Sequence, residues 1–313
     1  MPVPSGRTPE EPVRELVVLG TSSNVPTRTR NHNGYLLRWD GAPHQDGILF
    51  DPGEGTQRQL THAGVPATAI TRICLTHMHG DHCYGLPGVL SRMVLDGVQR
   101  PVELHYPASG EDVVRALVGL ATPGLELRLR PHGGPGEIAE GLEVVALRHR
   151  IETYGYRLIE PDGRSLVPER LAAAGISGPD VGRLQREGEL RGVRLADVSV
   201  ARRGQSVAVV MDTAECAGAE QLADGVDLLL VESTFGADTA ELAETYLHLT
   251  AAQAGALAAR SGARTTVLTH FSSRYVDVAP LLEEARAAAP GAQITAADDL
   301  DRVPLPPRRA HDT

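Results

Sequence analysis

Residues 76–88 read THMHGDHCYGLPG and place three histidines and one aspartate within six positions: His77, His79, Asp81 and His82. Imidazole and carboxylate groups are side chains that bind zinc in proteins. The apolar residues 73–75 just upstream predict a short buried strand, so the cluster lies where a strand ends and a loop begins. The stretch therefore predicts a metal centre. We interpret the adjacent Cys83 as a packing residue rather than a further ligand.

Composition predicts a globular protein of the cytoplasm. The 313 residues are 42% hydrophobic and 22% charged, and we expect a single domain over residues 1–313 with flexible tails at 1–13 and 304–313. No apolar run approaches the length of a membrane span, and the opening MPVPSGRTPEEP lacks the basic and apolar regions of a signal peptide. The three cysteines are therefore expected to be reduced thiols.

The charge is acidic overall but unevenly spread. The formal net charge of −10 argues against a broad nucleic-acid surface. From residue 154 to residue 206, however, nine arginines stand against seven carboxylates, so this segment is mildly basic. Carboxylates that bind a divalent metal also overstate the negative charge of the working protein. Binding of a nucleic acid is therefore not excluded.

Hydrophobic periodicity predicts an α/β fold. Strands are expected at 15–20, 35–39, 47–51, 72–76, 102–106, 126–130, 142–148, 154–160, 206–211, 226–232 and 265–269, and helices at 56–62, 86–95, 111–120, 242–260 and 278–289. Between 161 and 203, frequent glycines and prolines break the pattern. We interpret this stretch as an inserted arm with one short helix.

Three further strands end in a potential ligand: residues 142–148 run into His149, 206–211 into Asp212, and 265–269 into His270. If these strands are neighbours in one α/β sheet, their carboxyl ends converge on one edge, where such sheets keep their sites. A lone histidine at a strand end is usually structural, so His149 and His270 gain weight only from the cluster. Together the five histidines and two aspartates fit two zinc ions with open positions for water.

The remaining histidines lack such a context and are left out of the predicted site. They are His32, His44, His62, His105, His132 and His311, whereas His248 is a site candidate of its own and is treated below.

The motif HxHxDH at residues 77–82 resembles that of the metallo-β-lactamase-fold hydrolases. This resemblance implies a four-layer αβ/βα sandwich with two metals at one edge. Within that group the chain resembles the ribonuclease Z family over nearly its whole length. The blocks that carry the resemblance are LGTSSNVPT (19–27), FDPGEGTQRQL (50–60), THMHGDHCYGLPG (76–88), YGYRLIE (154–160), ESTF (232–235), HLTAAQA (248–254) and LTHFSSRY (268–275).

The family resemblance implies a role for each ligand. His77, His79 and His149 would hold one zinc, and the other would be held by Asp81, His82 and His270. Asp212 would bridge the two ions, and Asp81 would also act as general base. Two departures stand out: Met211 replaces the glycine usual before the bridging aspartate, and residues 175–190 make a compact version of the arm that clamps tRNA. The resemblance also implies a homodimer.

His248 is the candidate proton donor. It lies two residues before Thr250, and Thr250 to Gln253 fits the capping box that starts a helix. A histidine near a helix N-terminus is well placed to meet a phosphate, and its titration range suits a general acid. The alternative is a buried histidine bonded to backbone; the family resemblance favours proton donation. Glu232 is a candidate to orient it, although a structural role is equally plausible.

Two sets of arginines are candidates for RNA contact. In the loop PTRTRN at 26–31, Arg28 and Arg30 could engage phosphate, and the loop resembles the family's PxKxRN loop near the tRNA 3′ end. In the arm, Arg183, Arg186, Arg191 and Arg194 could bind the tRNA backbone. The alternatives are a solvated basic loop and a charge-mixed surface in which Glu187 and Glu189 pair with the arginines.

These features together predict a zinc-dependent endoribonuclease that cuts precursor tRNA 3′ of the discriminator nucleotide. A second hypothesis is a hydrolase of the same fold that acts on a small ester, a sulfate ester or a cyclic nucleotide. A third is a metal-dependent RNA-binding protein without activity, against which the full ligand set and His248 argue.

Overall fold

A computed structural model describes residues 14–39 and 46–309, which form two compact units. The main unit comprises the described residues up to Leu158 together with Val207–Pro306. The inserted unit comprises Ile159–Ser206 and the described residues from Pro307 onward. The expected tail at 1–13 lies outside the described residues, as do residues 310–313. Within the described ranges, no helix is long and apolar enough to cross a membrane.

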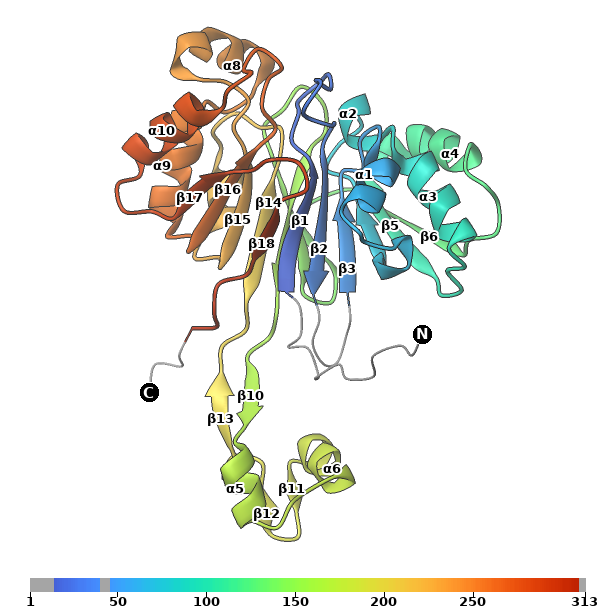
Figure 1. Cartoon of the computed structure of the whole chain (residues 1–313), viewed down its shortest axis with the longest axis vertical. Helices are drawn as coiled ribbons and strands as arrows, with labels where there is room; N and C mark the ends of the chain where they lie inside the picture. Colours follow the sequence, from blue (N-terminus) through green and yellow to red (C-terminus); the bar gives the residue numbers. More distant parts are fainter. Residues whose placement is uncertain (1–13, 40–45, 310–313) are drawn as a thin grey trace, which may run out of the picture. The chain divides into compact units, whose positions relative to one another are not determined.

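Two seven-stranded mixed sheets form the centre of the main unit (Figure 1). The first has the order β18 (Arg302–Pro304), β1 (Arg14–Gly20), β2 (Gly34–Trp39), β3 (Asp46–Phe50), β4 (Arg72–Cys74), β5 (Val102–Pro107) and β6 (Leu127–His132). The second has the order β17 (Ile294–Ala296), β16 (Thr265–Thr269), β15 (Leu228–Glu232), β14 (Ser206–Val210), β9 (Tyr154–Ile159), β8 (Leu142–Ala146) and β7 (Gly136–Ala139).

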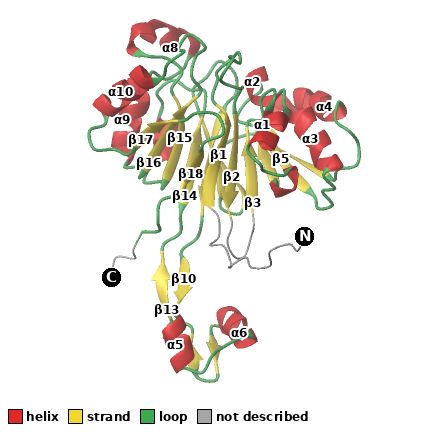
Figure 2. Ribbon diagram, viewed as in Figure 1, coloured by secondary structure: helices red, strands yellow, loops and turns green. Residues whose placement is uncertain are grey.

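Helices cover the outer face of each sheet (Figure 2). Those on the first sheet are α1 (Thr56–His62), α3 (Leu86–Leu95) and α4 (Glu111–Gly119), and those on the second are α7 (Ala217–Ala223), α9 (Ala251–Ser261) and α10 (Ala279–Ala288). Two further helices, α2 (Gly80–Cys83) and α8 (Ala240–Tyr246), lie in the loops that carry the site. Three single turns of 3₁₀ helix lie at Ala67–Ala69, Ala108–Gly110 and Ala237–Thr239.

The side-chain alternation of β1 explains the layers. Leu16 and Val18 belong to the core between the two sheets, whereas Val17 and Leu19 belong to the core under α1, α3 and α4. Successive strand residues point to opposite faces, so an apolar residue at every position requires burial on both faces. The predicted four-layer αβ/βα sandwich is therefore confirmed.

The prediction of one helix over residues 242–260 is wrong. The chain forms α8 and α9 instead, separated by a link in which Leu247 has a left-handed φ of 57°. A helix cannot continue through that conformation. The predicted capping box is present: Thr250 accepts from the Gln253 backbone, and the Gln253 side chain accepts from the Thr250 backbone. The break frees His248 to enter the site.

Several short elements were not predicted from the sequence. They are β7, β17, β18 and α7. The expected tail from residue 304 is also wrong over its described part: Pro304 pairs with Glu15 in β18, and the Leu305 N–H donates to the Arg14 carbonyl at 2.9 Å. These strands have only three or four residues, too few for a hydrophobic period to register.

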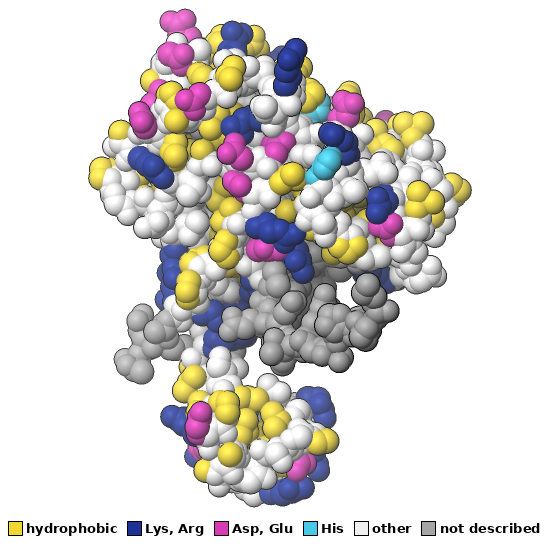
Figure 3. All heavy atoms as spheres, viewed as in Figure 1, with side chains coloured by type: hydrophobic (Ala, Val, Ile, Leu, Met, Phe, Trp, Pro, Cys, Tyr) yellow, Lys and Arg dark blue, Asp and Glu magenta, His cyan; other side chains and the backbone are white. Residues whose placement is uncertain are grey.

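The inserted unit has its own small core and more structure than the single helix that was predicted. An antiparallel pair of strands, β10 (Gly163–Leu166) and β13 (Ser199–Arg202), begins and ends it; between them lie the helices α5 (Pro168–Ala173) and α6 (Pro179–Glu187) and a hairpin of β11 (Glu189–Leu190) and β12 (Val193–Arg194). The buried side chains are Leu171, Ile176, Leu184, Leu190 and Val198. On the face in Figure 3, hydrophobic side chains of this unit lie centrally and basic ones lie around them.

Candidate metal centre

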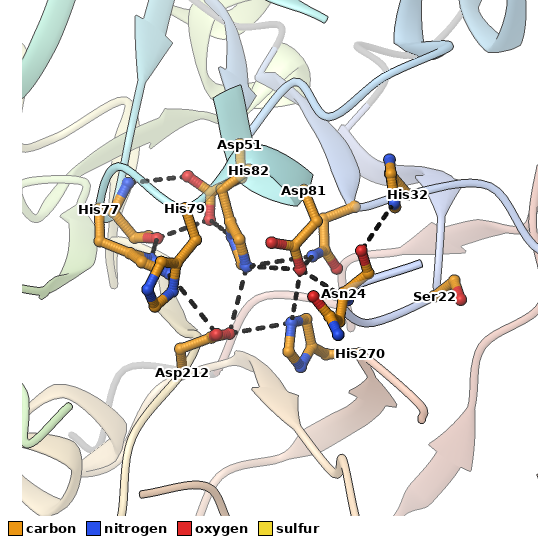
Figure 4. Close-up of polar contacts among 12 residues, drawn as sticks. Ser22, Asn24, His32, Asp51, His77, His79, Asp81, His82, Asp212 and His270 are labelled. Atoms are coloured by element: carbon orange, nitrogen blue, oxygen red, sulfur yellow. Dashed lines mark hydrogen bonds and ion pairs between the residues drawn. The ribbon is translucent and has the colours of Figure 1, made fainter. Parts of the chain in front are cut away.

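The predicted ligands come together, but from both sheets; all of them except His149 are labelled in Figure 4. His77 to His82 follow β4 of the first sheet, whereas His149, Asp212 and His270 follow β8, β14 and β16 of the second. The expectation that these strands are neighbours in one sheet is therefore wrong. Face-to-face packing brings the loops of both sheets to the same end of the sandwich, and the centre bridges them.

Three imidazoles and one carboxylate oxygen form the first group. Nδ1 of His79 lies 3.0 Å from Nε2 of His77 and 3.3 Å from Nε2 of His149. Oδ2 of Asp212 lies 3.5 Å from Nε2 of His77 and 3.7 Å from Nε2 of His149. Four potential ligand atoms thus face one point.

The second group uses the other oxygen of Asp212. Its Oδ1 lies 3.3 Å from Nε2 of His82 and 3.0 Å from Nε2 of His270. Oδ2 of Asp81 lies 3.4 Å and 3.5 Å from the same two nitrogens. Asp212 therefore turns one oxygen toward each group.

The buried side chains of Thr76 and Asp51 orient two histidines of the 77–82 motif. The Thr76 hydroxyl donates to Oδ2 of Asp51 at 2.7 Å, and since it has one proton to give, its oxygen accepts from Nδ1 of His77 at 2.9 Å. Nδ1 of His82 donates to the same Asp51 oxygen at 2.8 Å. Both imidazoles, when neutral, carry their proton on Nδ1 and turn the Nε2 lone pair into the centre.

Hydrogen bonds to Thr234 and to the Leu247 carbonyl orient His270 and His149 in the same way. The Thr234 hydroxyl donates to Oε2 of Glu232 at 2.5 Å and accepts from Nδ1 of His270 at 2.7 Å. Nδ1 of His149 donates to the Leu247 carbonyl at 3.1 Å, because a carbonyl can only accept. When neutral, the four imidazoles thus present Nε2 lone pairs, which is the arrangement that a bound cation requires.

The backbone around the centre is strained. Asp51, Leu247 and His270 adopt left-handed φ angles of 44°, 57° and 60°. Such a conformation costs a residue with a side chain about 1–3 kcal/mol, and it persists only where the surroundings enforce it. Here it places the Asp51 and His270 side chains and the Leu247 carbonyl against their partners.

Burial and the carboxylates act in opposite directions on the ionisable groups. Burial lowers the pKa of His77 and His149 below the ordinary value. Burial also opposes protonation of His270, but Asp212 and Asp81 outweigh it and raise the pKa to about 10. Burial would raise the pKa of Asp81, yet the nearby His82 and His270 hold it well below its usual range. Asp81 therefore stays ionised.

The donor set fits a divalent cation. Oδ1 of Asp212 and Nε2 of His270 are buried and lack an aligned hydrogen-bond partner among the described residues, although they lie 3.0 Å apart. Buried polar atoms are nearly always paired, so unpaired ones that face a common point call for a ligand. Imidazole nitrogens with carboxylate oxygens suit zinc and related ions. These side chains therefore form a divalent-metal site.

His248 lies beside the centre on the link between α8 and α9. Its Nδ1 lies 3.0 Å from Oε1 of Glu232, and its Nε2 lies 3.9 Å from Oδ2 of Asp212. The side chain is 12% exposed. Burial lowers the pKa of His248, but Glu232 and Asp212 more than offset this and raise it. The ring is thus held at the edge of the centre with a raised pKa.

A cleft of about 600 Å³ opens over these groups. His32, which was left out of the predicted site, lines it, and its Nε2 lies 3.2 Å from the Asn24 carbonyl. Other lining residues were not predicted either: Asn24, Tyr84, Arg150, Phe235 and Tyr246. Each of them lies close in sequence to a predicted site residue or within a block that follows a strand. That position was the signal that could have pointed to them.

The two arginines of the 26–31 loop have different surroundings. Arg28 is exposed. Arg30 is only 10% exposed, and its guanidinium donates to the Thr21 hydroxyl, the Ala297 carbonyl and the Asp298 carboxylate. Arg30 is therefore occupied in holding the loop, and Arg28 is the one that faces solvent.

The arginines of the inserted unit are exposed and mostly paired with neighbours. Arg183 contacts Glu187 at 2.8 Å, Arg191 contacts Asp180 at 3.0 Å, and Arg194 contacts Asp197 at 3.1 Å. Arg186 is exposed in the last turn of α6. None of these residues belongs to the compact unit that holds the metal centre.

Sequence comparison gives a family and full-length relatives. The family described as "Beta-lactamase superfamily domain" matches residues 47–271. A protein named "Ribonuclease Z" from Streptomyces avermitilis is 55% identical over 303 residues, which cover 95% of this chain and 99% of that protein. One of the same name from Chlamydia pneumoniae is 39% identical and covers 94% and 97% of the two chains.

Solved structures share the fold. The short form of human tRNase Z superposes with a TM-score of 0.65 at 23% identity, covering 93% of this chain and 99% of that one. The metallo-β-lactamase-fold protein YhfI from Bacillus subtilis gives a TM-score of 0.67 at 16% identity, with 93% and 99% coverage. At these identities the structures establish the metallo-β-lactamase fold and no more.

Proposed function

We propose that this chain, which belongs to the ribonuclease Z family, is a metal-dependent endoribonuclease that hydrolyses precursor tRNA 3′ of the discriminator nucleotide. The observation that carries the proposal is the 55% identity to a protein named "Ribonuclease Z" over 95% of the chain. The grouping of seven ligand side chains under a cleft supports a hydrolytic reaction.

For the metals, we infer two zinc ions per subunit. His77, His79 and His149 would hold one and Asp81, His82 and His270 the other, with Asp212 shared between them. The groups His77, His79, His149, Asp212 and Asp81, His82, His270, together with the two-sided approach of Asp212, support this assignment. A third group of potential ligand atoms joins Asp212 and His270 to His248, which we assign to proton donation instead. When bound, such ions supply an activated water and neutralise charge on the phosphate.

The chain's own residues orient that reaction. Asp81 is the proposed general base. Its Oδ2 accepts the Asn24 backbone N–H at 2.8 Å, which leaves its carboxylate fixed at the floor of the cleft. Its low pKa keeps the carboxylate ionised at neutral pH, and its fixed position over the centre would let it accept the proton of the attacking water.

His248 is the proposed general acid. The phosphodiester bond breaks as the 3′ oxygen of the discriminator nucleotide leaves, and that oxygen needs a proton. Nδ1 of His248 is engaged by Glu232, so Nε2 is the atom that faces the cleft and can deliver it. Glu232 stabilises the protonated ring before transfer.

The remaining proposals concern RNA binding by the inserted unit, the oligomeric state and the cellular compartment. The exposed arginines of the inserted unit, Arg183 and Arg186 among them, would bind the phosphate backbone of tRNA without reading its sequence. Arg28 would contact the RNA 3′ region. A homodimer, in which each subunit's arm meets RNA on the other, and a cytoplasmic location complete the proposal.

Purified zinc-loaded protein should be incubated with a precursor tRNA and, separately, with bis-p-nitrophenyl phosphate. Cleavage that leaves a 3′ hydroxyl on the discriminator nucleotide is expected. Hydrolysis of the small ester with none of the precursor would sink the proposal and favour a small-ester hydrolase. Inactivity on both would favour an RNA-binding role.

A further inference from the structure

A cationic and an aromatic side chain meet at one rim of the cleft. The guanidinium of Arg150 lies 5.7 Å from the centre of the Tyr246 ring, and both residues line the cleft. Tyr246 is 42% exposed, and Arg150 is exposed as well. From this pair we infer a stacking platform for the base of the discriminator nucleotide. The inference rests on the proposed function.

Flat exposed groups of this kind suit a nucleobase. Unpaired RNA bases stack on tyrosine rings and on arginine guanidinium planes, and the cation and ring also attract one another. Phe235 and Leu242 line the same cleft and supply apolar surface. The Phe235 ring lies 5.9 Å from that of His248, centre to centre, so this apolar wall reaches the proton donor.

The platform is tied to the chemistry through the backbone. Arg150 directly follows His149 in the sequence. Tyr246 is the last residue of α8, and the next residue, Leu247, accepts the His149 Nδ1–H through its carbonyl. His248 follows. The Arg150–Tyr246 pair therefore borders the proposed ligand His149 and the proposed acid His248. The imidazole rings of these two histidines lie 5.0 Å apart, centre to centre.

The direction of the reaction decides which base the platform takes. The proton from His248 goes to the 3′ oxygen of the discriminator nucleotide, so this nucleotide must lie on the His248 side of the scissile phosphate. Its base then has Tyr246 and Arg150 as the adjacent stacking surface. Since every base has a flat face, stacking positions the nucleotide without selecting its identity.

The test uses three precursor tRNAs: intact, abasic at the discriminator, and abasic at the first trailer nucleotide. In the zinc-loaded protein, Tyr246→Ala should lower kcat/KM about 10-fold or more on the intact precursor. On the precursor without a discriminator base it should cause little further loss, since the stacking partner is already gone. On the third precursor the full loss should persist.

Matched variants separate stacking from general damage. Tyr246→Phe keeps the ring face and should stay close to the wild-type kcat/KM, whereas Arg150→Gln should lose a smaller factor than Tyr246→Ala. Metal content of each variant should equal that of the wild type. If Tyr246→Ala lowered kcat/KM by the same factor on all three precursors, the inference would be overturned. The same holds if the loss disappeared only on the precursor that is abasic at the first trailer nucleotide. Failure of the proposed function is distinguishable, because the wild-type protein would then leave the intact precursor uncut and the inference would fall with it.

Discussion

Nδ1 of His248 lies 3.0 Å from Oε1 of Glu232, and the same carboxylate oxygen accepts the Thr213 backbone N–H at 2.7 Å. Glu232 is completely buried, and its other oxygen accepts the Thr234 hydroxyl. The carboxylate therefore cannot swing away, and it holds one nitrogen of His248 while leaving the other toward the cleft. The ring sits 3.9 Å from Asp212, so its role as acid or ligand has to be separated by experiment.

Replacing His248 with alanine should lower the cleavage rate of precursor tRNA about 10²- to 10⁴-fold, the usual contribution of a general acid, while both metals are retained. Single-turnover cleavage and metal analysis measure the two quantities. The exposed His62, on α1, offers a matched control, and His62→Ala should change neither. Depletion of metal in His248→Ala would identify this histidine as a ligand instead.

Asp212→Ala should lose metal as well as activity. One oxygen of Asp212 faces each ligand group, so its removal weakens both sites together rather than one. Metal analysis after dialysis should give clearly less than the wild-type content per chain, whereas the exposed-site control Asp197→Ala should match the wild type. Full metal occupancy in Asp212→Ala would rule out a bridging role.

Arg28→Ala and Arg30→Ala should have different effects. Arg30 donates to three groups and is largely buried, so its loss should lower the free energy of unfolding by about 1–3 kcal/mol in urea titration. Arg28 is exposed, so its loss should leave stability unchanged and raise KM for precursor tRNA. If Arg30→Ala kept wild-type stability and only KM rose, direct contact between Arg30 and RNA would be the better explanation.

The double variant Arg183→Ala/Arg186→Ala should weaken tRNA binding most at low salt. Each phosphate contact contributes about one unit to the slope of log affinity against log salt, so the slope should fall by about 2. Filter binding with uncleavable tRNA at several salt concentrations measures it. Arg115→Ala, at an exposed arginine of α4, is the control. An unchanged slope would remove these arginines from the interface.

His132 should make the protein sensitive to acid. The Tyr156 hydroxyl donates to the Leu75 carbonyl and accepts from Nε2 of His132, whose buried Nδ1 has no hydrogen-bond partner among the described residues. Burial, helped by His105, lowers the pKa of His132 to about 4. Below pH 6.5 His132 becomes protonated in the unfolded chain, whereas in the folded chain it becomes protonated only near pH 4.

The free energy of unfolding should therefore fall between pH 6.5 and pH 4, by on the order of 1–3 kcal/mol from this residue. Urea titration across that range measures the loss. His132→Gln should show a shallower fall than the wild type, and His62→Gln serves as control at an exposed histidine. Parallel curves for His132→Gln and the wild type would contradict the assignment.

Hydrophobic periodicity predicted the α/β class, and the four layers came from the family resemblance; apolar strands such as β1 and β15 fit those layers because both of their faces are covered. The sequence also predicted the seven side chains that gather at the metal centre, because four of them form one dense motif after β4, and His149, Asp212 and His270 each follow a strand within three residues. It did not predict Asp51, whose role depends on a left-handed backbone that brings it to Thr76 and His82. That contact joins residues 25 and 31 positions apart, beyond the reach of any local pattern.

The arrangement of the site across two sheets was equally hidden. Strand ends can be recognised one at a time, but which sheet holds each strand follows from pairings such as β3 with β4 and β15 with β16. The break at Leu247 is another example: helix propensity favours continuation there, and tertiary contacts of His149 and His248 with that link outweigh it.

The distribution of the ligands along the chain, from His77 after β4 to His270 after β16, has a consequence for biosynthesis. A partly translated polypeptide that ends before β16 contains β1 to β6 of the first sheet with their helices, yet it lacks β18 and His270 and cannot complete the second group of ligands. A nascent chain on the ribosome, surrounded by RNA, thus has no complete metal centre until most of its length has been made. The onset of nuclease activity is delayed by the order of synthesis itself, without a separate inhibitor.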